Sequence, residues 1–165
     1  MERKWIKLDE NKFSLVAGNK TLGEMQISTK TTALTATCKI GEEDFTIKRT
    51  GFWKSAVEML DSKGGLVAKT HNEKWYANSL ILEYGNKKYK IILHNNPLAE
   101  YAIIDEGQTL LSYGLHSDSG KIGIKITVNK DHSHLLFDLL LWYLFVPIVI
   151  ENTGDDFGFL LLMIA

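Results

Sequence analysis

Hydrophobic and polar residues alternate along much of the chain between residues 13 and 128. Leu34, Ala36, Cys38 and Ile40 face one way, for example, and the polar residues between them face the other. A period of two predicts strands with one apolar and one solvent-facing side. Eleven segments fit this pattern: 13–17, 21–28, 33–40, 44–49, 54–60, 65–71, 76–84, 88–94, 99–105, 109–115 and 121–128. Residues 5–8 are a further candidate edge strand.

The strands recur with an offset of 44 residues. Phe13, Val57 and Tyr101 occupy equivalent positions, and so do Leu22, Leu66 and Leu110, at this same spacing. The pattern predicts three units of four strands each, at about residues 12–50, 54–95 and 99–130. Three propeller blades would fall below the usual range of about four to eight. One continuous sheet, which curls into a closed antiparallel barrel of about twelve strands, fits the pattern better.

An apolar segment follows the strands. Residues 135–150 contain one charged residue, Asp138, and one proline, Pro147. We expect a helix over about residues 132–146, capped by Asp131 or Ser133 and kinked or ended at Pro147. A barrel of about twelve strands is too wide for strand side chains to fill, so the pattern predicts a central hydrophobic helix. The segment is short for a membrane span, which needs about 17–25 apolar residues, so we expect no transmembrane helix. The tail, residues 151–165, is left to form the last strand or to cover the barrel mouth.

Composition sets the class of protein. The chain has 165 residues with 45% hydrophobic and 24% charged residues, which suits one domain with a sizeable core, here residues 1–165. The net charge of -1 gives no reason to expect a nucleic-acid partner. One cysteine and a charged N-terminus without an apolar run point to a cytoplasmic protein rather than a secreted one.

The hairpins and the apolar segment together resemble the tubby C-terminal-like superfamily, which includes the plant LURP-one-related proteins and the cytoplasmic barrels of phospholipid scramblases. The similar residues are the hairpins with Asp and Gly at their turns, 58–67 and 101–111, and the late apolar helix, 135–146. The resemblance implies a twelve-stranded barrel around a central helix. It also implies a link to lipid, because tubby-type members bind phosphoinositides through surface basic residues.

A basic strip between residues 48 and 90 is the main candidate binding site. Its predicted members are Lys48, Arg49, Lys54, Lys87, Lys88 and Lys90. Cations near a membrane contribute about 1 kcal/mol each to the attraction of anionic head groups. The competing interpretation is that the strip is an ordinary solvated face.

The sequence contains few signs of a metal site or a catalytic site. His134 and Asp138 share a helical face but supply only two metal ligands, so we expect no metal or other cofactor and a structural partner for Asp138. Cys38 falls on the apolar face of its strand and is predicted to be an inert core thiol. Residues 18–23 imitate a phosphate-binding loop but lack its Lys and Ser/Thr. No nucleophile–base arrangement stands out, and we expect a protein that is not an enzyme.

Three functions remain open. The chain is predicted to be a non-enzymatic interaction or scaffold domain, which pairs with a protein partner or a second copy through an edge strand. The first alternative is binding of phosphoinositide or another anionic lipid head group on a membrane surface through the basic strip. The second alternative, a carrier of small apolar ligands, requires a cavity of about 300 Å³ or more.

Overall fold

The computed structural model describes residues 2–28, 35–51, 55–74, 76–95, 98–129 and 134–153. These residues are mainly β structure, with twelve strands followed by one helix. The strands are β1 (Arg3–Asp9), β2 (Lys12–Ala17), β3 (Lys20–Ser28), β4 (Thr35–Ile40), β5 (Glu43–Thr50), β6 (Ala56–Asp61), β7 (Leu66–Asn72), β8 (Ser79–Tyr84), β9 (Lys87–Asn95), β10 (Ala99–Asp105), β11 (Gln108–Asp118) and β12 (Lys121–Val128). The helix is α1 (Leu135–Thr153).

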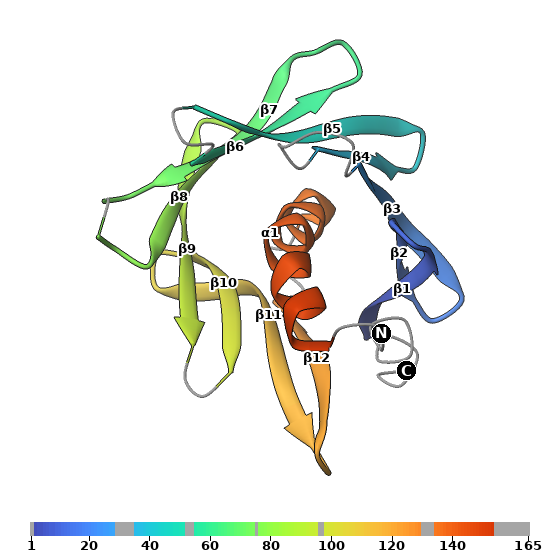
Figure 1. The fold of residues 1–165 in the computed structure, drawn as a ribbon. Coiled ribbons are helices and arrows are strands. Elements are labelled where there is room, and N and C mark those ends of the chain that lie inside the picture. Colours follow the sequence, from blue (N-terminus) through green and yellow to red (C-terminus); the bar gives the residue numbers. More distant parts are fainter. Residues whose placement is uncertain are drawn as a thin grey trace.

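Every strand pairs with its neighbour in the sequence, so the sheet is an antiparallel meander from β1 to β12. Figure 1 shows the strands curled into a nearly closed barrel, seen end-on. The eleven strands expected from alternation are confirmed as β2–β12. The candidate edge strand at residues 5–8 lies within β1, which brings the sheet to twelve strands. The described residues end at 153, so the possible pairing of the tail lies outside them.

The strands share irregularities at regular intervals. The register shifts between Leu15 and Val16 where β2 pairs with β3, between Met59 and Leu60 where β6 pairs with β7, and between Ile103 and Ile104 where β10 pairs with β11. Shifts of this kind bend a strand and increase its local twist. These three therefore help the wall to curve at corresponding points.

The helix differs from its predicted bounds. It begins at Leu135 and continues through Pro147 to Thr153, so the predicted end near residue 146 was wrong, and of the two effects expected of Pro147 the end of the helix is excluded. Pro147 is exposed, while Val149 beyond it is buried and Ile148 packs against the core. Burial of these apolar side chains outweighs the hydrogen bond that the proline removes. Residues 151–153 consequently belong to the helix and not to the tail.

The helix and the inward faces of the strands share one hydrophobic core. Trp142 stacks on Trp5 of β1 with ring centroids 5.0 Å apart, and Phe145 meets Tyr101 of β10 edge to face at 5.4 Å. In Figure 1, α1 is drawn inside the outline of the strands. Residues 135–152 are long and apolar enough to cross a membrane, a test that a core helix also passes, and 61% of this window is buried in the fold.

Candidate functional site

The lysines of the predicted basic strip are largely neutralised by carboxylates. Lys87 forms an ion pair with Asp105, whose hydrogen bond raises the pKa of the lysine. Lys90 lies 3.3 Å from Glu73, and Lys88 lies 3.7 Å from Glu83. These pairs are at least partly exposed, and such pairs contribute little to stability. Their effect on the surface is to cancel the charge that the sequence suggests.

The same neutralisation extends across the outer wall as a row of alternating charge. In the strand register, Lys48 of β5 lies opposite Glu58 of β6, which lies opposite Lys69 of β7. Lys69 in turn lies opposite Glu83 of β8, and Glu83 lies opposite Lys88 of β9. Opposite charges at directly paired positions attract one another across a sheet. This face therefore matches the solvated alternative more closely than a continuous basic patch.

Two of the strip's lysines share a hollow at one end of the barrel. Lys87 and Lys88 line it with Lys69, in a volume of about 470 Å³ that Glu83 also lines. Lys48, Arg49 and Lys90 do not line this hollow. Lys54 lies outside the described residues. The predicted set is thus not brought together at one place.

Arg49 is separated from the lysines because it lies on the inward-facing side of β5. It follows Phe45 and Ile47, both buried, at the same period of two, whereas Lys48 has the opposite parity. Its guanidinium carbon lies 5.7 Å from the centre of the Tyr143 ring of α1, within range for a cation–π contact. Among the described residues, no carboxylate forms an ion pair with Arg49. The partly buried Arg49 therefore has Tyr143 as a neutral aromatic neighbour and no counter-charge from the described part of the chain.

Arg49 lines a hollow of about 270 Å³ at the inner edge of the barrel wall, which we call the Arg49 hollow. Its other lining residues are apolar or neutral: Ser55, Val57, Thr70, Asn72, Leu80, Leu93, Tyr101 and Leu144. Among the described residues that line it, Arg49 is the only one with a charge. From Lys87 to Leu93 along β9 is about 20 Å at about 3.3 Å per residue, so the Arg49 hollow and the lysine hollow lie toward opposite ends of the strands.

Two tyrosines near Arg49 remain protonated at neutral pH. Burial raises the pKa of Tyr101 and of Tyr143, and the positive charge of Arg49 offsets part of each rise. A neutral phenol can donate a hydrogen bond, and a guanidinium offers several donors in a planar fork. The hollow therefore combines hydrogen-bond donors, one positive charge and apolar walls. This combination suits an anionic group attached to an apolar body.

A second hollow adjoins the first at the C-terminal end of α1, and we call it the helix-end hollow. Its volume is about 600 Å³, and it shares Leu93 and Tyr101 with the Arg49 hollow. These two residues are directly paired across β9 and β10. Leu98, Leu115 and Ile148 give this hollow a partly apolar lining. The two hollows are therefore neighbours that share these two lining residues.

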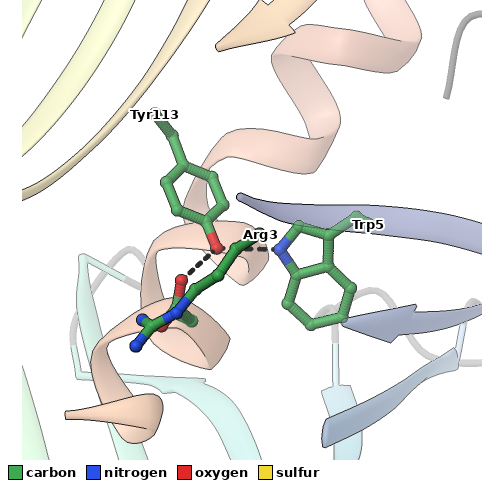
Figure 2. Close-up of polar contacts among 4 residues, drawn as sticks. Arg3, Trp5 and Tyr113 are labelled. Carbon is green, nitrogen blue, oxygen red and sulfur yellow. Dashed lines mark hydrogen bonds and ion pairs between the residues drawn. The ribbon is translucent and has the colours of Figure 1, made fainter. Parts of the chain in front are cut away.

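The most deeply buried polar groups form a separate network at the start of α1. Asp138 is fully buried and accepts hydrogen bonds from Arg3 of β1 at 2.5 Å and from the Tyr113 hydroxyl of β11 at 2.7 Å. The Trp5 indole donates a hydrogen bond to the same Tyr113 hydroxyl at 2.8 Å, and Figure 2 shows these two side chains facing each other. Burial raises the pKa of Asp138 to about 6. The network ties β1 and β11 to α1, and Arg3 and Tyr113 are the partners that the sequence could not name.

The remaining candidates have structural surroundings. Cys38 is buried, and burial raises the pKa of its thiol to about 12. Little thiolate forms at neutral pH, which supports the prediction of an inert core thiol. The His134 ring packs beside Tyr84 and Phe137, with centroids 5.3 Å away in each case. Asp138 is engaged by Arg3 and Tyr113, and within the described ranges there is no group of three or more metal-ligating side chains.

Comparison with known proteins adds no assignment. No family model matches the chain, and neither the curated proteins nor the solved structures include a significant match. The sequence did contain one signal for the Arg49 hollow: Arg49 continues the inward parity of β5 and lies 44 residues before Leu93, where the next unit has an apolar side chain.

Proposed function

We propose that this protein is a non-catalytic binding module that takes a small anionic ligand in the Arg49 hollow. The observation that carries the proposal is an arginine on the inward face of the wall, with no carboxylate among the described residues that line its hollow. A partly buried charge gains from a counter-charge, and a carboxylate or phosphate group would supply one through bidentate hydrogen bonds. The hydroxyl of Tyr101 and the side chains of Thr70 and Asn72 add neutral polar partners.

Binding of anionic lipid head groups through the basic strip has less support. Lys87, Lys88 and Lys90 each have a carboxylate partner, and Lys48 belongs to the row of alternating charge. A lipid phosphate would have to displace these carboxylates before it gained the full attraction of the cations. We retain Arg49 from the predicted set and propose it, rather than the lysines, as the anion-binding residue.

A scaffold role through strand pairing has less support for a different reason. Within the described residues, β1 pairs only with β2, and β12 pairs only with β11. Both edges carry features that discourage pairing with another chain: Lys4 and Lys7 with a register shift near the end of β1, and Lys121 and Lys125 on β12. We propose ligand binding in preference to edge-to-edge assembly.

Two features of the architecture, the repeat units and the central position of α1, are also proposals. We infer that three four-stranded units descend from one repeat, which the register shifts after Leu15, Met59 and Ile103 support through their spacing of 44 residues. We also infer that α1 is the central helix of the barrel, in agreement with its buried residues. A tubby-like ancestry, a cytoplasmic location and the absence of catalysis remain proposals of the same kind.

The test compares two neighbouring cations on β5. Arg49→Met removes the charge in the hollow, and Lys48→Met removes one on the outer wall. Thermal unfolding is measured with benzoate, octanoate and octyl phosphate, and with octanol as the uncharged counterpart. At a ligand concentration one hundred times Kd, binding stabilises the fold by about 2.7 kcal/mol, which raises Tm by about 5–10 °C for a chain of this size.

We expect at least one anion to raise the Tm of the wild type and of Lys48→Met but not of Arg49→Met. Each variant is first unfolded without ligand, so that loss of the Tyr143 contact is not mistaken for loss of binding. The proposal fails if no anion raises Tm, or if Arg49→Met responds as the wild type does. Anionic vesicles form a separate arm: binding that depends on Lys87, Lys88 and Lys90 would favour the basic strip instead.

A further inference from the structure

The two adjoining hollows differ in chemistry in a way that defines a ligand. The Arg49 hollow has one positive charge, and its volume of about 270 Å³ lies below the usual range for small-molecule sites, about 300–1,000 Å³. The helix-end hollow, at about 600 Å³, lies within that range. Among the described residues, its lining includes apolar groups from β10, β11 and α1 and one carboxylate, Glu151, near the end of the helix. Its other polar lining residues are Asn78, His94, Asn95 and Asn152. A ligand confined to the first hollow would leave the second unused.

Leu93 and Tyr101 connect the two volumes. They are directly paired across β9 and β10, and both line each hollow. Tyr101 also packs its ring edge-on against Phe145 of α1, so its position is set by the core. An apolar chain that crosses this pair would keep contact with side chains along its length.

We propose that the ligand is an amphiphile, with a carboxylate or phosphate head at Arg49 and an apolar chain that crosses Leu93 and Tyr101 into the helix-end hollow. This inference rests on the proposed function and adds the class of ligand to it. Arg49 orients the molecule because it attracts the anionic head, and the carboxylate of Glu151 disfavours the head in the other hollow, whose only other titratable side chains among the described lining residues are His94 and Tyr101. The chain contributes by leaving water for contacts with Leu98, Leu115 and Ile148.

The experiment measures affinity against chain length. Acetate, butyrate, hexanoate and octanoate are titrated into the full chain by calorimetry. Each methylene that leaves water contributes about 0.8 kcal/mol, equivalent to about a fourfold gain in affinity. We therefore expect octanoate to bind up to about two-hundredfold more tightly than butyrate. Octyl phosphate and octanoate, tested side by side, distinguish a phosphate head from a carboxylate head.

Leu98→Gln tests the path of the chain, with Leu66→Gln as its control. Leu66 is 59% exposed and lines the lysine hollow, toward the opposite end of the strands. We expect Leu98→Gln to weaken octanoate at least tenfold and butyrate less than twofold, whereas Leu66→Gln changes neither. Tryptophan fluorescence confirms that both variants are folded before titration.

The outcomes separate the two proposals. If acetate and octanoate bind equally well and depend on Arg49, the amphiphile is refuted and anion binding stands. If octanoate gains affinity with chain length but Leu98→Gln has no effect, the path into the helix-end hollow is refuted. If none of the four carboxylates and neither octyl phosphate nor benzoate binds, both proposals fall.

Discussion

The buried carboxyl group of Asp138 should contribute more to the stability of the protein in mild acid than at neutral pH. Its pKa is raised from 3.8 to about 6, chiefly by burial, although Tyr113 and Arg3 act in the opposite direction. At a pH between these two pKa values, Asp138 is protonated in the folded protein and ionised in the unfolded chain. Its contribution to the free energy of unfolding therefore falls as the pH rises from about 4 to about 7.

The size of the effect follows from the shift. A rise from 3.8 to about 6 corresponds to at most about 3 kcal/mol, since one pKa unit is equivalent to about 1.4 kcal/mol. The Asp138→Asn variant cannot ionise at this position, so it lacks this pH dependence. We expect the stability of the wild type relative to Asp138→Asn to be greater at pH 4 than at pH 7, by up to this amount.

Urea unfolding at pH 4, 5, 6 and 7, followed by the fluorescence of the buried tryptophans, measures the difference. Other carboxylates titrate in both proteins, and their contributions largely cancel when the two are compared at each pH. Glu42→Gln, a change at an exposed turn residue, serves as the control and should stay within about 0.5 kcal/mol of the wild type throughout. A difference that is constant with pH, or that grows as the pH rises, would refute the reasoning, because the Arg3 ion pair would then outweigh burial.

Three further predictions concern the same fold. Tyr113→Phe should lower the free energy of unfolding by about 2–4 kcal/mol in urea at pH 7, because Asp138 loses a donor and the Trp5 indole loses its acceptor; a loss below about 1 kcal/mol would contradict this. Cys38 should resist a thiol reagent at pH 8 in the native protein and react fully in urea, since it is buried and its pKa is raised to about 12; rapid labelling of the native protein would show that the core opens. Gly85→Ala should cost about 1–2 kcal/mol because Gly85 has φ +58°, and Gly85→Asn should cost less because asparagine tolerates this conformation; equal losses would exclude backbone strain as the cause.

Alternation predicts the strands well because the inward face of each one packs against a shared core. Phe45 and Ile47 on β5, for example, are buried at the positions where the period of two places them. The first strand has a weaker pattern of alternation. Trp5 is the one buried residue of β1, and Lys4 and Lys7 lie close to it in the sequence. Its place in the sheet depends on the contacts of Trp5 with Tyr113 and Trp142, which are distant in the sequence.

The candidate site was less predictable than the fold. Sequence proximity grouped Arg49 with Lys48, but neighbouring residues of a strand face opposite ways, and only Arg49 enters a hollow with apolar walls. The carboxylates that pair with Lys87, Lys88 and Lys90 come from neighbouring strands or from the loop before β8, so their effect depends on register. The end of α1 could not be placed either, because the packing of Val149 outweighs the local effect of Pro147.

The connection between Arg3 and Asp138 has a consequence for biosynthesis. Their side chains meet although 135 positions separate them along the chain, whereas each strand pairs with the strand made just before or after it. A growing polypeptide can therefore assemble hairpins as it emerges, but the aromatic side chain of Trp5 has no Trp142 to cover it until the helix has been translated. We infer that the apolar inner faces of the strands stay exposed on the ribosome until α1 has been translated. Chaperones would be needed most before that point.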